Sequence, residues 1–188
     1  DQVGECESLS SGRDVFHWVD EKLLPDTHIN QYLLDGSDNF AARIHAHENG
    51  RLQIKDLGRE RLMGRHAWGV HPKNIYQAMA LDALLDPTLD LVILTGPAGC
   101  GKTLLAMAAA LELVVERGIY ERIIVTRNTP EIAESIGFLP GTEEEKMLPW
   151  LAAVTDTLEV LHKHDVSKDT SLAYIMEKAN IQFKSVNF

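Results

Sequence analysis

A phosphate-binding pattern directly after an apolar, β-branched run is the feature that most constrains the fold. Residues 91–95 read Leu-Val-Ile-Leu-Thr, and residues 96–103 read Gly-Pro-Ala-Gly-Cys-Gly-Lys-Thr, which meets every position of the Walker A pattern. Strong helix formers follow. This order is typical of P-loop proteins that bind nucleoside triphosphates. The sequence predicts a strand over 91–95, a phosphate-binding loop and a helix from Lys102 to about Arg117.

The residue types in the loop suit separate parts of phosphate binding. Glycine lets the backbone adopt conformations closed to other residues, so that successive N–H groups point into one concavity at the start of a helix. Lys102 is expected to contact the β- and γ-phosphates, and the Thr103 hydroxyl to bind Mg²⁺, which makes both candidate catalytic residues. A glycine turn with a solvated Lys102 is the less favoured alternative. The expected nucleotide-binding residues are Gly96, Pro97, Ala98, Gly99, Cys100, Gly101, Lys102 and Thr103.

Composition and charge limit the classes of protein to which the chain can belong. Of its 188 residues, 45% are hydrophobic, which is enough for a buried core. The net charge of −10 makes the surface as a whole repel nucleic acid, so any RNA contact requires a local basic groove. Cys6 and Cys100 lie far apart, and we find no signal peptide or membrane-length apolar run. These features predict a cytoplasmic protein without a membrane partner.

Residues 1–62 are expected to form a small β-rich connector domain. Asn49-Gly50 is a strong signal for a hairpin. The pattern predicts a three- or four-stranded meander or a small barrel. A basic connector over 58–69 follows, and the linker between the domains is expected over 63–71. Strands are expected over residues 13–20, 28–34, 41–47 and 51–57.

Residues 72–188 alternate between helical and strand patterns, which favours an α/β class with a parallel sheet. The chain begins at Asp1 and stops at Phe188 inside a strand pattern, so we interpret it as an internal fragment of a longer protein. Helices are expected over 72–85, 102–117, 142–162 with a break near 149, and 171–178; strands are expected over 91–95, 122–126 and 181–188.

Other polar residues are weaker candidates. Gln77 lies near the start of the helix before the loop, where its amide could bind adenine; an ordinary solvated amide is the favoured alternative. Thr126 and Arg127 end a predicted strand at the edge where ligands bind in α/β sheets, but a surface arginine accounts for the pattern equally well. The histidine pairs 45/47 and 162/164 lack further ligands at metal-binding spacing.

Three stretches together resemble the PhoH-like ATPases. They are Asn-Ile-Tyr-Gln-Ala-Met-Ala-Leu at 74–81, the loop at 96–103, and Thr126-Arg127 followed by Gly-Phe-Leu-Pro-Gly-Thr-Glu-Glu-Glu-Lys-Met-Leu-Pro-Trp at 137–150. The last phrase is far more specific to that family than the Walker A loop. The resemblance covers about residues 70–188. The segment before it is similar to the connector of two-part members, in which an RNA-cleaving PIN domain precedes the ATPase.

The resemblance implies a RecA-like P-loop core with a parallel sheet and flanking helices, here as the N-terminal part of the domain over 72–188. It implies ATP and Mg²⁺ as cofactors, and it links the two-part members to ATP-driven unwinding and cleavage of RNA. By position, Gln77 would bind adenine, and residues 99–103 would bind phosphate and Mg²⁺. Thr126 and Arg127 would contact single-stranded RNA.

The sequence also departs from the family pattern. Cys100 stands where threonine is commoner, and Asn128 opens a stretch where Arg-Pro is more usual, which puts the role of Arg127 in question. No Asp-Glu pair closes an apolar strand after the loop, so the Walker B acid and any arginine finger are expected beyond Phe188. We therefore predict a fragment that binds ATP·Mg²⁺ but hardly hydrolyses it.

Two other functions remain open from the sequence. One is a P-loop kinase of a small metabolite, which would need an acceptor-binding lid. The other is a non-enzymatic assembly module whose nucleotide binding drives the formation of a homo-oligomeric ring, an idea that rests on analogy alone. Stimulation of hydrolysis by RNA distinguishes the ATPase from both.

Overall fold

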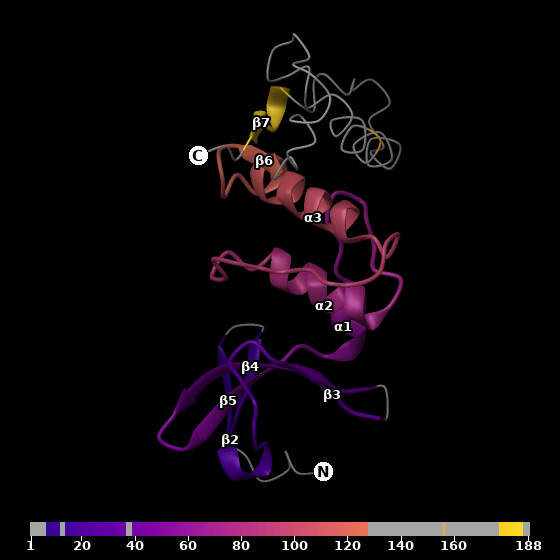
Figure 1. Cartoon of the computed structure of the whole chain (residues 1–188). Coiled ribbons are helices and arrows are strands. Elements are labelled where there is room, and N and C mark those ends of the chain that lie inside the picture. Colours follow the sequence, from indigo (N-terminus) through magenta and orange to yellow (C-terminus); the bar gives the residue numbers. More distant parts are fainter. Residues whose placement is uncertain (1–6, 12–13, 37–38, 128–155, 157–176, 186–188) are drawn as a thin grey trace, which may run out of the picture. The chain divides into compact units, whose positions relative to one another are not determined.

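The structure, a computed structural model, describes residues 7–11, 14–36, 39–127, 156 and 177–185 (Figure 1). Contacts between Cα atoms divide the chain into two compact units. The first unit comprises Asp1–Arg65 and Pro72–Met79, and the second comprises His66–His71 and Ala80–Phe188. The division falls within helix α2 (Ile75–Leu84). The domain boundaries expected from the sequence, with a linker over 63–71, stay a prediction.

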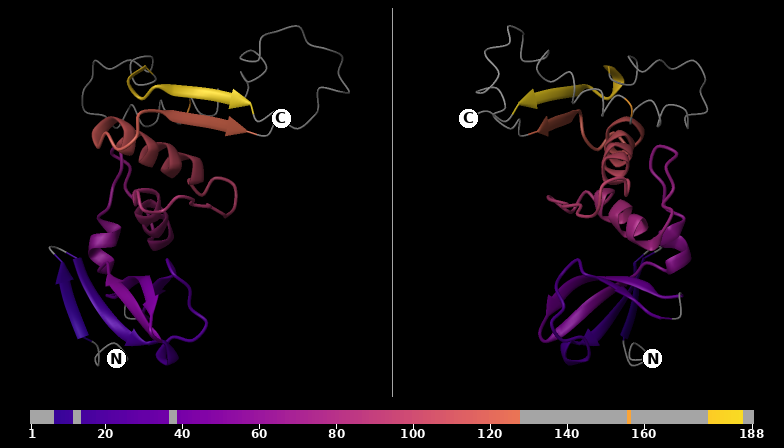
Figure 2. Two further views of the ribbon diagram at one scale, coloured as in Figure 1. Left: turned by 90° about the vertical axis from the view of Figure 1, so that its left-hand side faces the viewer. Right: turned by 45° about the vertical axis from the view of Figure 1, so that its right-hand side comes forward.

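A five-stranded antiparallel sheet forms most of the first unit. Its strands are β1 (Glu7–Ser11), β2 (Asp14–Asp20), β3 (Tyr32–Leu34), β4 (Ala41–Glu48) and β5 (Arg51–Asp56). Their order in the sheet is β1-β2-β5-β4-β3 (Figures 1 and 2). Asn49 and Gly50, with φ of 51° and 73°, join β4 to β5 in the conformation of a type I′ hairpin, which confirms that signal. The serine-rich β1 is not among the predicted strands because it lacks a clear apolar alternation.

The register of the strands gathers one set of apolar side chains on one face of this sheet. Because side chains alternate along a strand, cross-strand partners share a face. Val19 lies opposite Leu52 and is 4% exposed, and Ile54 is fully buried. The core on this face consists of Val19, Ala42 and Ile54, with Leu24, Leu33 and Phe40 packed against them.

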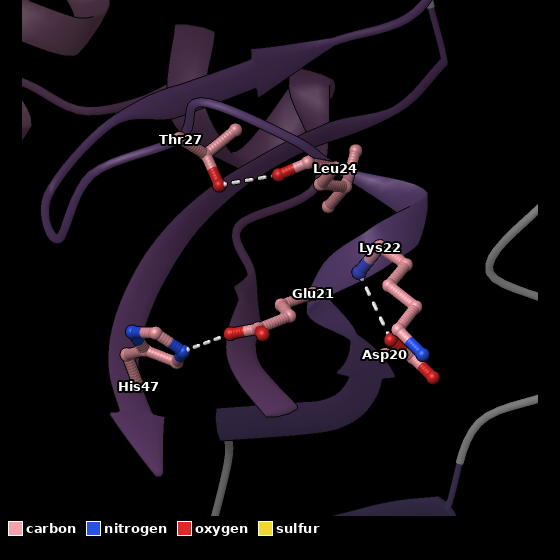
Figure 3. Close-up of polar contacts among 6 residues, drawn as sticks. All are labelled: Asp20, Glu21, Lys22, Leu24, Thr27 and His47. Carbon is pink, nitrogen blue, oxygen red and sulfur yellow. Dashed lines mark hydrogen bonds and ion pairs between the residues drawn. The ribbon is translucent and has the colours of Figure 1, made fainter. Parts of the chain in front are cut away.

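A short 3₁₀ turn, η2 (Glu21–Leu23), follows β2 (Figure 3). Asp20 caps it, because its carboxylate accepts a hydrogen bond from the main-chain N–H of Lys22 at 2.9 Å. The N–H of Glu21 donates to the carbonyl oxygen of Gly50 at 3.1 Å. The carboxylate of Glu21 also lies 2.5 Å from Nε2 of His47. The turn is thereby held against the β4–β5 hairpin.

Two helices complete the first unit. α1 (Arg59–Met63) begins within the segment expected to be a connector. This short helix was not predicted because glycines flank it on both sides. The first part of α2 packs beside it, and the hydroxyl of Tyr32 donates to the carbonyl oxygen of Met79 at 3.1 Å. The buried residues between these elements and the sheet are Ala41, Leu57, Leu62 and Ala78.

In the second unit, a long helical segment packs against a parallel pair of strands (Figure 2). α3 (Lys102–Leu111) continues into a π-helical turn, η3 (Glu112–Glu116). β6 (Ile123–Arg127) pairs in parallel with β7 (Ile181–Ser185). The predicted helix, both strands and their parallel direction are thus confirmed. Their common core includes Leu81, Leu85, Leu105, Ala108, Leu111 and Ile123.

The strand predicted over residues 91–95 is wrong for this structure. The segment pairs with no strand in the part of the chain that the structure describes, and the side chains of Leu91 and Ile93 are 77% and 74% exposed. An apolar composition favours extended backbone, but a strand also needs a neighbour that satisfies its N–H and C=O groups. The helices predicted over 142–162 and 171–178 lie outside the described residues, except for Asp156, Glu177 and Lys178, which are helical.

Candidate nucleotide-binding site

The backbone of the loop depends on its glycines. The φ angles of Gly96, Gly99 and Gly101 are 150°, 78° and 90°, values that residues with a side chain rarely adopt. A Cβ added to Gly96 would also lie 3.1 Å from Sγ of Cys100, whereas one added to Gly99 would meet nothing within 4 Å. Backbone conformation requires glycine at all three positions, and a close approach adds to the requirement at Gly96.

The loop leads directly into the N-terminus of α3. Gly101 is the N-cap in the left-handed conformation, and no side chain caps the first N–H groups of this ten-residue helix. The N–H of Leu105 donates to the carbonyl oxygen of Gly101 at 2.9 Å, which closes the first helical turn. N–H groups at a helix start and the positive end of the helix dipole together favour a bound anion. The geometry therefore suits a phosphate group.

The side chain of Lys102 folds back over the loop. Its ammonium group donates hydrogen bonds to the carbonyl oxygens of Gly96 at 2.9 Å and Pro97 at 2.8 Å. Nζ also lies 3.6 Å from Sγ of Cys100. The ammonium is thus held beside the concavity of the loop rather than extended into solvent. Sequence reasoning identified Lys102 but gave no sign of these carbonyl contacts.

The other polar residues of the loop are accessible. Thr103 is the second residue of α3 and is exposed. Cys100 carries a thiol and is partly buried. Hydroxyl oxygen is a suitable ligand for Mg²⁺, so Thr103 fits the role that the sequence gives it. Among the described residues, no group of three or more His, Cys, Asp or Glu side chains could hold a metal ion by itself.

Gln77 caps the helix to which it belongs. Its main-chain N–H donates to Oδ1 of Asn74 at 3.0 Å, and its side-chain Oε1 accepts from the N–H of Lys73 at 2.7 Å. This reciprocal arrangement closely resembles a capping box. Gln77 belongs to the first unit and the loop to the second, so its contact with adenine stays a prediction.

Thr126 and Arg127 are the last two residues of β6, as predicted. In the parallel ladder they lie opposite Lys184 and Ser185 of β7, so the carboxyl ends of both strands meet at one edge. Sequence reasoning did not identify Lys184 and Ser185. Ligands of open α/β sheets bind at this edge, but a nucleic-acid contact by Thr126 and Arg127 stays a prediction.

Nothing in the described helices is both long and apolar enough to cross a bilayer.

Elsewhere in the second unit, a tight turn joins residues 67 and 70, which exchange main-chain hydrogen bonds of 3.1 and 2.8 Å. The turn stacks the rings of His66 and His71, whose centroids are 5.1 Å apart. The sequence pattern did not associate this histidine pair.

Comparison with known proteins identifies relatives of the chain. A family model described as PhoH-like protein matches residues 69–188. The chain is 48% identical over 96 residues to Protein PhoH2 of Bacillus subtilis (strain 168), a match that covers 51% of this chain and 22% of that protein. It is 38% identical over 135 residues to Protein PhoH2 of Mycolicibacterium smegmatis, covering 71% and 29% respectively. No solved structure matches the chain significantly.

These matches cover less than a third of the length of either relative. The family model nevertheless matches more than half of this chain, including the whole loop at 96–103. The match confirms the resemblance drawn from the sequence, and it assigns the α/β chain a P-loop nucleotide-binding fold. The chain therefore belongs to the family of PhoH-like proteins.

Proposed function

We propose that the chain binds ATP and Mg²⁺ as part of an ATPase that couples hydrolysis to the unwinding or processing of RNA. The observation that carries the proposal is the loop at 96–103, with three glycines at positive φ and the Lys102 ammonium held beside them. Membership of the PhoH-like family supports nucleotide hydrolysis in general. The link to RNA comes from the resemblance to the two-part members, and the cytoplasmic location and the ring are parts of the same proposal.

The chemistry of phosphoryl transfer depends on positioning and charge neutralisation. When a triphosphate enters, the Lys102 ammonium exchanges the carbonyl oxygens of Gly96 and Pro97 for phosphate oxygens, so that its donors stay satisfied in both states. The N–H groups at the start of α3 bind the other phosphates of the triphosphate. The Thr103 hydroxyl would hold Mg²⁺, which supplies additional neutralisation of phosphate charge.

Within the P-loop class, we propose that the whole protein has a RecA-like core. The exposed side chains of Leu91 and Ile93 have the pattern of a buried strand. In the proposed core, residues 91–95 would join the sheet of β6 and β7 and bury both side chains. Thr126 and Arg127 would then lie at the same edge as the phosphate loop. The acidic residue that positions water would come from elsewhere in the whole protein.

Nucleotide titration tests the proposal at Lys102. Lys102→Ala removes a charge-assisted contact to phosphate, so we expect the affinity for a fluorescent ATP analogue to fall about 10- to 100-fold. Lys22→Ala, a change of the same charge in η2, is the matched control and should leave the affinity unchanged. Equal affinity of the two variants, both still folded by circular dichroism, would overturn the proposal.

Hydrolysis assays separate this function from its rivals. The chain alone should hydrolyse ATP at less than about a tenth of the rate of a longer protein that includes the acidic residue, because such groups contribute factors of about 10² or more. In the longer protein, single-stranded RNA should stimulate hydrolysis. A response to a small acceptor instead would indicate a kinase, and no response to either would indicate an assembly module.

A further inference from the structure

One face of the sheet in the first unit carries aromatic rings and cations that the nucleotide site does not use. Phe16 and Trp18 alternate along β2 and are only partly buried. Arg51 and Lys55 lie on β5, which pairs with β2, and Lys55 is directly opposite Phe16. His45 is the extra residue of a β-bulge in β4, and its ring lies 5.2 Å from that of Phe16. We refer to these five residues as the aromatic face.

The aromatic face lies on the opposite side of the sheet from the core of Val19, Ala42 and Ile54. Val19 is adjacent to Trp18 in β2 and is buried in that core, and Ile54 is adjacent to Lys55 in β5 and is fully buried. Because adjacent residues of a strand point to opposite faces, Trp18 and Lys55 point away from this core. A second core, of Ala41, Leu57, Leu62 and Ala78, lies on the same side of the sheet as Lys55, but neither Phe16 nor Trp18 belongs to it. Burial against either core therefore does not explain why large rings occupy these positions.

The cations lie near the rings but at the outer limit of a cation–π contact. The guanidinium of Arg51 is 5.8 Å from the centroid of the Trp18 ring, and the ammonium of Lys55 is 5.9 Å from that of Phe16. Such contacts extend to about 6 Å. The contacts are therefore loose, and both cations can approach a ligand without the loss of a close internal interaction with these rings.

We propose that the aromatic face binds single-stranded RNA. Unpaired bases stack on indole and phenyl rings, and the phosphates between them attract neighbouring cations, which is the combination that proteins use for single strands. An acidic protein as the partner would explain the cations of the aromatic face but not its rings. A duplex would hide its bases from Phe16 and Trp18. The choice of RNA rests on the proposed function; the site lies in a different unit from the phosphate loop.

Carboxylates near the face set how strongly it attracts phosphate. Asp14 forms an ion pair with Lys55, at 2.9 Å between Nζ and Oδ2, and its side chain is 51% exposed. Glu48 lies opposite Arg51 in the ladder. Asp20 lies opposite Arg51 in the pairing of β2 with β5, and its Oδ1 accepts the hydrogen bond that caps η2. Asp14 therefore competes with RNA for Lys55, and its removal should strengthen binding.

Anisotropy of a labelled single-stranded RNA of about 12 nucleotides tests the proposal, with the full chain and no nucleotide present. Arg51→Gln and Lys55→Gln should each weaken binding about 3- to 10-fold and reduce its salt dependence by about one phosphate contact. Trp18→Leu should weaken binding at least about 5-fold, and Trp18→Phe should retain most of it. Asp14→Asn should tighten binding. Lys22→Gln, a change of the same charge in η2 outside the aromatic face, should have no effect.

Several results would overturn the proposal. One is no binding of RNA by the unaltered chain at about 100 µM, the weak end of nonspecific binding. Another is equal loss with Lys22→Gln and Arg51→Gln, which would indicate general charge attraction. Stronger binding of duplex RNA, of DNA of the same sequence or of polyglutamate would assign the face to that ligand. Loss of RNA binding in Lys102→Ala would assign the RNA to the loop, whereas loss of ATP binding alone leaves the aromatic face intact.

Discussion

The carboxylate of Glu112 accepts a hydrogen bond from the main-chain N–H of Trp68 at 3.2 Å, across 44 residues of sequence. Trp68 has a φ of 48°, which costs energy for a residue with a large side chain. The other carboxylate oxygen of Glu112 accepts from Nε of Arg117, also at 3.2 Å. One partly buried side chain therefore fixes a strained turn to the end of the helix that begins at the phosphate loop.

We predict that Glu112→Ala lowers the free energy of unfolding by about 1–3 kcal/mol, because it leaves the N–H of Trp68 without this partner. Glu116→Ala is the matched control, since Glu116 is an exposed residue of the same π-helical turn. It should change stability by less than about 0.5 kcal/mol. Urea unfolding measures both variants, and equal effects would contradict the role given to Glu112.

Cys100 provides a probe of the loop that needs no mutation of the binding residues. Its thiol is part of the loop and lies 3.6 Å from the Lys102 ammonium. Bound phosphates should block access to it, so ATP with Mg²⁺ should slow alkylation of Cys100 by a maleimide. Mass spectrometry of the modified peptide measures the rate. Adenosine, which has no phosphate, is the control ligand; equal rates with and without ATP would place the phosphates elsewhere.

Gly99 and Gly36 form a matched pair for testing backbone strain. An added Cβ would meet nothing within 4 Å at either position, but only Gly99 has a positive φ, of 78°. We expect Gly99→Ala to cost about 1–2 kcal/mol within the loop and to weaken binding of ATP about 5- to 30-fold. Gly36→Ala should leave ATP binding unchanged. Isothermal calorimetry checks both, and unaltered binding by Gly99→Ala would show that the loop tolerates a side chain there.

Gln77 and Asn74 separate capping from recognition of the base. Gln77→Ala and Asn74→Ala each remove one hydrogen bond of the cap, and each should destabilise the chain by about 0.5–2 kcal/mol. Only Gln77→Ala should also lower the affinity for ATP relative to GTP. Competition between the two nucleotides measures this ratio. The same ratio in both variants would restrict Gln77 to its structural role.

The features that could be predicted from the sequence are those set by local interactions. Asn49-Gly50 forms the expected hairpin because both residues tolerate positive φ. The loop and α3 follow from glycine spacing and helix propensity. The direction of β6 against β7 was predicted because helical sequence patterns lie between the two strand patterns.

The features that could not be predicted depend on distant partners. Residues 91–95 have the composition of a strand, but composition does not supply the neighbouring strand that would pair with them. Gln77 looked like a solvated amide because its contact with the N–H of Lys73 depends on where the helix begins. The aromatic face depends on the register of β2 against β5 and on a bulge, neither of which is visible in a single strand.

The pairing of Ile123 with Ile181 has a consequence for synthesis of the chain. β4 and β5 can join as soon as both have left the ribosome, since only a tight turn separates them. β6 must instead wait for more than fifty further residues before β7 emerges. Translation proceeds at about 5–20 residues per second, so the edge of β6 stays unpaired for several seconds. The nascent second unit therefore passes through an interval in which a chaperone can bind where β7 will later lie.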